Sequence, residues 1–171
     1  RKRIADSCKE MYTVNLGGTA IGSAINVSDA YFYNVVPCLA RITGYPLSQA
    51  ADLFDATENL DGFVAVSGAV KTCAVNLSKM CNDLRLLSSG PRTGLGEINL
   101  PAKQNGSSIM PSKVNPVIPE VVTQVAFLVV GHDTTITMAA EAGQMELNAF
   151  EPVLFYNLFE SIQTLEGAVK T

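Results

Sequence analysis

Apolar residues recur at alternating steps of four and three through the segment 61–89. The seven positions are Val66, Val70, Cys73, Leu77, Met80, Leu84 and Leu87. This spacing forms an apolar seam along a helix that packs on neighbouring helices at a shallow angle. The sequence therefore predicts a long helix over 61–89, ended by Gly90 and Pro91.

Helical periodicity continues through most of the chain. A second long helix is expected from near Pro119, a residue suited to the first turn, through "EVVTQVAFLVVGHDTTITMAAEAGQ". A third is expected from about Leu147, and an N-terminal helix from about 23 to 43, stopped by "GYP". A shorter helix capped by Ser48 follows in "PLSQAADLF". Because no convincing strand alternation accompanies these segments, the predicted fold is all-α, a bundle of long helices.

Composition limits the classes of partner. Hydrophobic residues make up 47% of the 171 positions and charged residues only 16%, which favours burial of apolar surface against other chains in a homo-oligomer. The net charge of -4 gives no basic face for nucleic acid. The most apolar window, "VVTQVAFLVVG", is short and flanked by Glu120, His132 and Asp133, so it is interpreted as a buried helix and not as a membrane span.

The cysteines do not form a metal-binding pattern. Cys8, Cys38, Cys73 and Cys81 include no CxxC pair, and His132 is the sole histidine. We therefore expect no metal site, and interpret the cysteines as reduced core residues of a cytoplasmic protein. The chain also begins without methionine and ends inside a helical pattern, which suggests a piece of a longer polypeptide.

One long stretch, 88–115, lacks clear periodicity, and loops of that length in compact domains are usually functional or mobile. It contains "GSSIMPSKVNP", which starts at Gly106 and brings two hydroxyls, a cation and an amide together in a stretch that also has two prolines. Lys113 and Asn115 could anchor a carboxylate, while backbone amides converging at a bend could stabilise added negative charge. The alternative interpretation is a capped, polar helix start that binds no ligand.

The same eleven residues closely resemble GSSxMPxKxN, the signature of the aspartase/fumarase superfamily. "NLGGTAIGS", "LSKMCNDLRLLSSGPR" and "GEINLPAKQNGSS" are similar to other segments of that superfamily. The stretch that begins "VIPEVVTQVAFLVVG" is similar to the aspartate ammonia-lyases in particular. The resemblance implies that 1–171 is a fragment of the central helical-bundle domain, with the signature loop at about 88–116 and the family's N-terminal and C-terminal domains absent.

The resemblance also implies an activity. Aspartate would lose ammonia to give fumarate, without a cofactor, in a cytoplasmic homotetramer. Removal of a C3 proton would give an aci-carboxylate whose negative oxygens need preorganised donors. In the family the first serine of the signature is the candidate base, which falls on Ser107.

The other family roles fall on neighbouring residues. Lys113 and Asn115 would hold substrate carboxylate. Ser108 would face the dianion together with the backbone of Ile109 and Met110, and Gly106 would permit the bend that brings these donors together.

Some family features are missing or changed. Glu120 matches a glutamate that pairs with an active-site histidine from an earlier segment, which this chain lacks, so the fragment is expected to be inactive alone. Ser112 stands where glycine or alanine is common, and His132 where asparagine is common. Because His132 follows an apolar run, packing or an interhelical hydrogen bond is favoured for it over a catalytic role.

Two other functions remain open at this point. A fumarate hydratase of the same superfamily would use the same loop, since the residues that separate the two reactions lie partly outside this chain. A non-catalytic helical assembly module, a different class of protein, is favoured by the low charge and the long apolar stripes.

Overall fold

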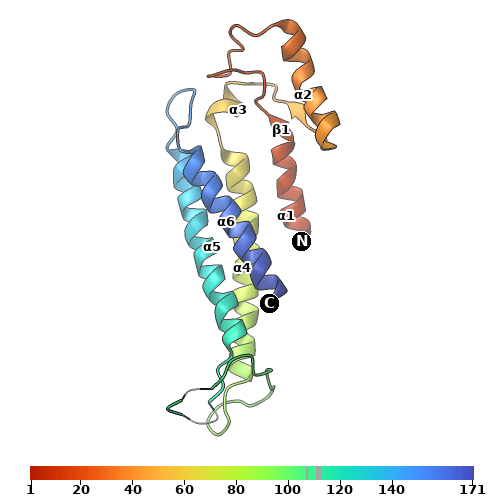
Figure 1. Cartoon of the computed structure of the whole chain (residues 1–171). Coiled ribbons are helices and arrows are strands. Elements are labelled where there is room, and N and C mark those ends of the chain that lie inside the picture. The colour runs from red at the N-terminus through yellow and green to blue at the C-terminus, as the bar shows by residue number, and fades with distance from the viewer. Residues whose placement is uncertain (107, 111–112) are drawn as a thin grey trace. The chain divides into compact units, whose positions relative to one another are not determined.

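Helices dominate the computed structural model, which describes residues 1–106, 108–110 and 113–171 (Figure 1). The elements in chain order are α1 (Lys2–Ser7), the 3-10 helix η1 (Cys8–Tyr12), β1 (Thr13–Val14), α2 (Asp29–Thr43), β2 (Ser48–Gln49), α3 (Asp55–Glu58), α4 (Asp61–Leu87), α5 (Val117–Glu141) and α6 (Glu151–Lys170). The two short strands pair in parallel, with Thr13 opposite Ser48 and Val14 opposite Gln49. The all-α prediction is confirmed.

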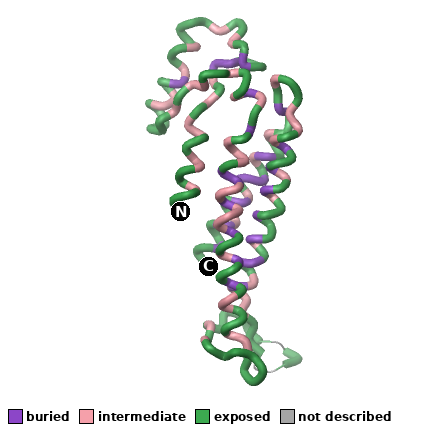
Figure 2. Tube along the Cα trace, turned by 180° about the vertical axis from the view of Figure 1, so that it is seen from behind, coloured by how far each residue is buried: buried purple, intermediate pink, exposed green. Residues whose placement is uncertain are grey.

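The chain divides into two compact units. The first comprises 1–69 and 133–159, and the second comprises 70–132 and 160–171. Each unit contains part of α4, α5 and α6, and buried positions recur along all three helices (Figure 2).

The core of the first unit is built from large apolar side chains. Ile136 of α5 and Leu154 of α6 are fully buried, and Val66 of α4 is 4% exposed. Phe63 and Phe155 pack edge to face, with ring centroids 4.9 Å apart. Val66 belongs to the seam that the sequence predicts, so hydrophobic periodicity accounts for part of this core, whereas Ile136, Phe63 and Phe155 are not among the seam positions.

A buried polar contact also joins α4 to α5 in the first unit. The Ser67 hydroxyl donates to Asp133 Oδ1 over 2.8 Å, and both residues are buried. Helix α5 is long and apolar enough to cross a membrane, a test that the core helix of a soluble protein also passes. A buried, hydrogen-bonded carboxylate on α5 favours the core-helix interpretation.

In the second unit, Cys81 of α4, Val122 of α5 and Ala168 of α6 form a buried cluster. His132 of α5 lies 3.0 Å from the Ser161 hydroxyl of α6, measured from Nδ1 to Oγ. The predicted interhelical hydrogen bond of His132 is therefore confirmed.

The cysteines differ in exposure. Cys81 is buried, and burial raises the pKa of its thiol, whereas Cys8 and Cys73 are half-buried and Cys38 is exposed. All four are free thiols. The prediction of core cysteines is therefore wrong for Cys38.

The predicted helix bounds are right at some ends and wrong at others. Helix α4 matches its predicted range to within two residues, and α5 begins at Val117, two residues before Pro119. Helix α2 starts at Asp29 instead of about 23, because Ala24 and Asn26 have positive φ angles of 52° and 63°. The Ser28 hydroxyl accepts from the Tyr31 N–H and caps this later start.

The helix predicted after Ser48 is also wrong. Ser48 lies in β2, whose backbone pairs with β1, and the next helix is the short α3. Helix α6 begins at Glu151 and not at about Leu147. Leu147 instead belongs to a turn, in which it exchanges two backbone hydrogen bonds with Gln144.

That turn is held by a single buried amide. Asn148 Nδ2 donates to the carbonyls of Ala139 and Ala140 over 2.9 and 3.2 Å, while its Oδ1 accepts from the Phe150 N–H over 2.8 Å. Gly143 lies directly beneath it, since a Cβ there would stand 3.2 Å from Nδ2. The Asn148 side chain therefore supplies hydrogen-bond partners for backbone groups at the end of α5 and at the start of α6.

We expect Asn148→Ala to lower the free energy of unfolding by about 2 kcal/mol, because it leaves buried backbone groups without partners. Urea unfolding followed by circular dichroism measures this. Asn34→Ala is the matched control: Asn34 is exposed and its amide bonds only within its own helix, to the Ala30 carbonyl. Equal losses in the two variants would contradict the role of Asn148.

Candidate active site

The signature segment connects the end of α4 to the start of α5 within the second unit (Figure 1). Between 88 and 116, the part that the structure describes contains no helix or strand. Its described residues from 101 to 115 are all exposed (Figure 2). The long loop predicted from the lack of periodicity is therefore present.

Gly106 lies against the backbone of Lys113. A Cβ on Gly106 would stand 2.5 Å from the Lys113 carbonyl oxygen, a distance that no side chain tolerates without backbone movement. The Lys113 N–H in turn donates to the Met110 carbonyl over 3.2 Å. The loop thus folds back on itself at the place where the sequence predicts a bend, and glycine permits the close approach.

Lys113 and Asn115 line one cavity of about 610 Å³, together with residues from two stretches of the preceding loop. The described residues of the lining are Ser88, Ser89, Gly90, Pro91, Gly96, Ile98, Asn99, Leu100, Pro101, Lys113, Val114, Asn115 and Pro116. Lys113 is the only charged residue of that lining, and Asn99 and Asn115 contribute amides. A cavity with one cation and several neutral donors suits a carboxylate.

The start of α5 adds to this positive character. Pro116 lines the cavity and α5 begins at the next residue, so the N-terminal end of the helix lies beside it. The first N–H groups of a helix carry partial positive charge, which favours an anion nearby.

Glu120 has a charged partner on another helix. Arg85 Nη2 of α4 lies 3.7 Å from Glu120 Oε1 of α5, with both side chains partly exposed. Glu120 is not among the residues that line the cavity. Sequence reasoning did not predict its pairing with Arg85, since a surface ion pair between two helices leaves no mark in local spacing.

Two other predicted site residues, Ser108 and Met110, are exposed and are not among the described residues that line the cavity. Ser107 lies outside the described residues. The structure therefore brings together Gly106, Lys113 and Asn115, while the roles of these three residues and of Ser107, Ser108, Met110 and Glu120 stay predictions.

Several lining residues were missed by sequence reasoning. Ser88, Ser89 and Asn99 lie in the loop predicted over 88–115 but were given no binding role, and all three contribute to the cavity. Two adjacent hydroxyls at a helix end, in the same long loop as the signature motif, were the signal that could have identified them.

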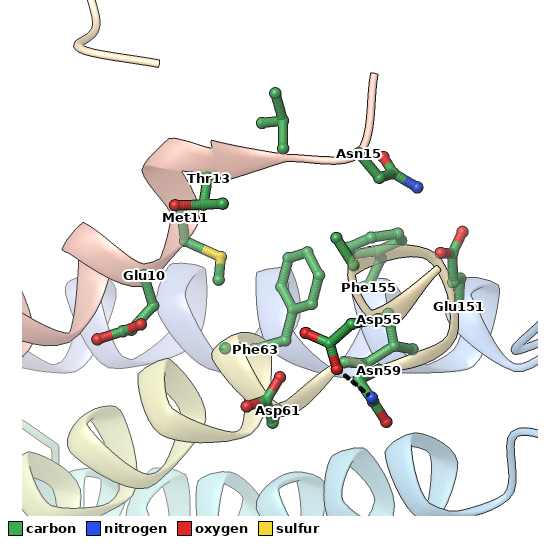
Figure 3. A pocket seen from close by; sticks show the side chains of 14 residues that line it. Glu10, Met11, Thr13, Asn15, Asp55, Asn59, Asp61, Phe63, Glu151 and Phe155 are labelled. Carbon is green, nitrogen blue, oxygen red and sulfur yellow. Dashed lines mark hydrogen bonds between the residues drawn. The ribbon is translucent and has the colours of Figure 1, made fainter. Parts of the chain in front are cut away.

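A second cavity, of about 530 Å³, lies in the first unit (Figure 3). Its lining includes four carboxylates, from Glu10, Asp55, Asp61 and Glu151, and no lysine or arginine. Asn59 donates to Asp55 Oδ1 over 2.7 Å at its edge. Four carboxylates disfavour an anionic ligand, so the cavity beside Lys113 is the better candidate for a carboxylate-bearing substrate.

Comparison with known proteins gives consistent matches. A family model described as Lyase matches residues 1–131. The chain is 54% identical over 170 residues to an aspartate ammonia-lyase of a Bacillus species, covering 99% of this chain and 36% of that protein. It is 56% identical over 167 residues to the aspartate ammonia-lyase of Escherichia coli (strain K12), covering 98% of this chain and 35% of that protein.

Two solved structures agree with these matches. A fumarate lyase:delta crystallin from Brucella melitensis, bound to cobalt, superposes with a TM-score of 0.94 at 53% identity, over 99% of this chain and 37% of that one. A class II fumarase from Schistosoma mansoni superposes with a TM-score of 0.93 at 32% identity, over 98% and 38%. The chain thus spans about a third of the length of the curated relatives that it matches.

Proposed function

The chain belongs to the lyase family of the aspartase/fumarase superfamily, and from this premise we propose that it is the central part of an aspartate ammonia-lyase. The longer chain that would contain it is called the full-length parent below. The observation that carries the proposal is the cavity whose only charged lining residue is Lys113. Identities above half to aspartate ammonia-lyases over nearly the whole chain support the choice of substrate.

The proposed reaction converts L-aspartate to fumarate and ammonia. The C3–H bond breaks first, its proton moves to a base, and the electron pair enters the adjacent carboxylate to form an aci-carboxylate dianion. That pair then forms the C2=C3 double bond as the C2–N bond breaks and ammonia leaves. The dianion carries more charge on its oxygens than the substrate does, so donors that are fixed in advance lower the barrier.

We assign the base to Ser107 and the substrate carboxylate contacts to Lys113 and Asn115. Ser108 and the Met110 backbone supply donors to the dianion when the loop closes over the substrate. Support for the Lys113 and Asn115 assignments comes from their shared cavity beside the start of α5. Glu120 acts from outside the cavity, through a histidine that the full-length parent supplies.

We further propose that residues 1–171 belong to the central helical-bundle domain of a cytoplasmic homotetramer, in which other segments complete the active site. The 171-residue chain alone is then inactive. Large apolar side chains exposed on the long helices support association between chains. In the second unit Phe127 is 66% exposed, and in the first unit Met138, Tyr156 and Phe159 are 62%, 66% and 63% exposed.

Size-exclusion chromatography with light scattering tests the association. We expect the 171-residue chain to elute with a mass of at least two copies of 18.2 kDa, because burial of these helix faces is favourable. A single peak at the mass of one copy, at micromolar concentration, would contradict this expectation.

The activity test separates aspartate from malate as substrate. Full-length parent is incubated with L-aspartate or L-malate, and fumarate is followed by its ultraviolet absorbance. We expect fumarate from aspartate. Fumarate from malate alone would assign the protein to the fumarate hydratases, which the fold similarity to the class II fumarase keeps as the second candidate. No fumarate from either substrate would favour the non-catalytic assembly module.

The bend at Gly106 gives a separate prediction. Gly106→Ala forces its Cβ against the Lys113 carbonyl, so Lys113 must move. We expect kcat/KM of the full-length parent for aspartate to fall by about 10-fold or more, since small misplacements of binding groups are costly. Gly167→Ala is the control, because a Cβ there meets nothing within 4 Å. Wild-type kcat/KM in Gly106→Ala would show that the bend is not needed.

A further inference from the structure

The segment that follows α4 closes into a tight turn, defined here as the 89–96 turn. The Ser89 hydroxyl donates to the Leu86 carbonyl over 2.6 Å and accepts from the Leu95 N–H over 3.1 Å. The Ser89 carbonyl accepts from the Gly96 N–H over 2.8 Å. One serine therefore bonds the end of the helix and the far side of the turn at the same time.

Gly94 lies in close contact with the backbone of Ser89 and Gly90 at the start of the same turn. A Cβ on Gly94 would stand 2.2 Å from the Ser89 carbonyl carbon and 2.4 Å from the Gly90 nitrogen. Both neighbours are backbone atoms, which cannot rotate away as a side chain would. Any side chain at 94 must therefore open the turn.

The chain that leaves the turn remains attached to α4. The N–H of Glu97 donates to the Leu87 carbonyl over 2.9 Å, and that of Ile98 to the same carbonyl over 3.4 Å. The carbonyls of Leu86 and Leu87, at the last residues of α4, thereby gain partners that the helix itself cannot supply. The position of 97–98 is consequently fixed to the end of a long helix.

This fixed stretch supplies much of the cavity that Lys113 and Asn115 share. Gly96, Ile98 and the residues from Asn99 to Pro101 line it, as do Ser88 to Pro91 at the start of the turn. Lys113 and Asn115 belong to an exposed part of the loop. The 89–96 turn and the residues that follow it join this side of the site to the end of α4 by hydrogen bonds.

We propose that Ser89 and Gly94 are positioning residues for the substrate: they hold the Ile98–Pro101 side of the cavity at the distance from Lys113 and Asn115 that a four-carbon dicarboxylate requires. This deepens the proposed function and rests on it. Neither residue takes part in bond making or breaking. Ser89 acts through its two hydrogen bonds, and Gly94 acts by leaving room for them.

The test uses the full-length parent with Ser89→Ala, Ser89→Thr and Gly94→Ala, and with Gly167→Ala as the control for a glycine in open space. Two quantities are measured, kcat and KM for aspartate and the Kd of fumarate by isothermal titration calorimetry. Fumarate is the product of both candidate reactions, so its binding reports on the cavity even if malate turns out to be the substrate.

We expect Ser89→Ala and Gly94→Ala to raise KM and the fumarate Kd by about 10-fold or more, with a smaller change in kcat. Ser89→Thr keeps the hydroxyl and should remain within about 3-fold of wild type, as should Gly167→Ala. A purely structural role would lower the amount of active enzyme, and so kcat, at unchanged KM and Kd.

Unchanged KM and Kd in Ser89→Ala would overturn the proposal, whether or not Gly94→Ala folds. Equal losses in Ser89→Ala and Ser89→Thr would overturn it too, since the hydroxyl would then not be the group that matters. Failure of the wild type to release fumarate from aspartate rejects the proposed function instead, and the fumarate Kd values still decide the role of the turn.

Discussion

Replacement of Lys113 by alanine in the full-length parent is expected to lower kcat/KM for aspartate by about 100-fold or more, roughly 3 kcal/mol of transition-state binding. Lys113 is the only charged residue in the lining of its cavity, so no neighbouring side chain of that lining can replace its charge. The loss should appear in both kcat and KM, because in the proposed mechanism the same ammonium would hold the substrate carboxylate and face the growing negative charge.

Lys103→Ala is the matched control for this variant. Lys103 is an exposed lysine of the same loop, ten positions earlier, and it does not line the cavity of Lys113. Steady-state kinetics on both variants separates a general loss of positive charge from the loss of one contact. Comparable kcat/KM for aspartate in Lys113→Ala and Lys103→Ala would show that Lys113 does not bind the substrate.

Ser107→Ala should lower kcat more than Lys113→Ala does. Removal of a general base typically slows the proton transfer by about 100- to 10,000-fold, whereas substrate binding through Lys113 and Asn115 remains. We therefore expect kcat for aspartate to fall by about 1,000-fold with KM changed by less than about 5-fold. Steady-state rates at saturating aspartate give the kcat effect, and single-turnover measurements show whether the proton-transfer step is the one that is slowed.

Ser112→Ala serves as its control, because alanine is one of the residues common at that position in the related signature. It should keep near-wild-type kcat. Should Ser107→Ala keep its full turnover, the base lies elsewhere and the proposed mechanism is wrong. Retained binding of fumarate in an inactive Ser107→Ala would separate loss of the base from loss of the site.

The sequence predicted the long helices because they bury a regular stripe. On α4 the step pattern includes the buried Val66 and Val70 but also Met80, which is 51% exposed, while α4 extends over Asp61–Leu87, within two residues of the prediction. Leu154 of α6 is buried at a position where helical spacing places an apolar residue, whereas Ile136 of α5 is buried without having been singled out by such a stripe. Such patterns are local and strong, so one chain suffices to find them.

The errors in the fold have non-local or backbone causes. Ser48 has the residue type of a helix cap, but its backbone pairs with Thr13, thirty-five positions earlier in the chain. Ala24 and Asn26 continue a helical pattern of side chains, yet their positive φ angles exclude a helix. Neither the partner strand nor the left-handed backbone can be read from the spacing of apolar residues.

The residues of the candidate site were likewise predicted only in part from the sequence. Lys113 and Asn115 were predicted because their residue types and spacing fit a known signature, and the structure places both in the lining of one cavity, while their roles stay predictions. Ser89 and Asn99 were not found, because they come from the other side of the loop and reach the cavity only through the fold of the 89–96 turn. Arg85 likewise reaches Glu120 from a different helix.

The Asn148 amide has a consequence for how this chain can diverge. It bonds carbonyls eight and nine residues before it and an N–H two residues after it. An inserted or deleted residue between Glu141 and Asn148 would displace the amide from both carbonyls at once. The connection of α5 to α6 should therefore tolerate exchanges of residue type while keeping a constant number of residues. Libraries that vary its length should yield few folded members.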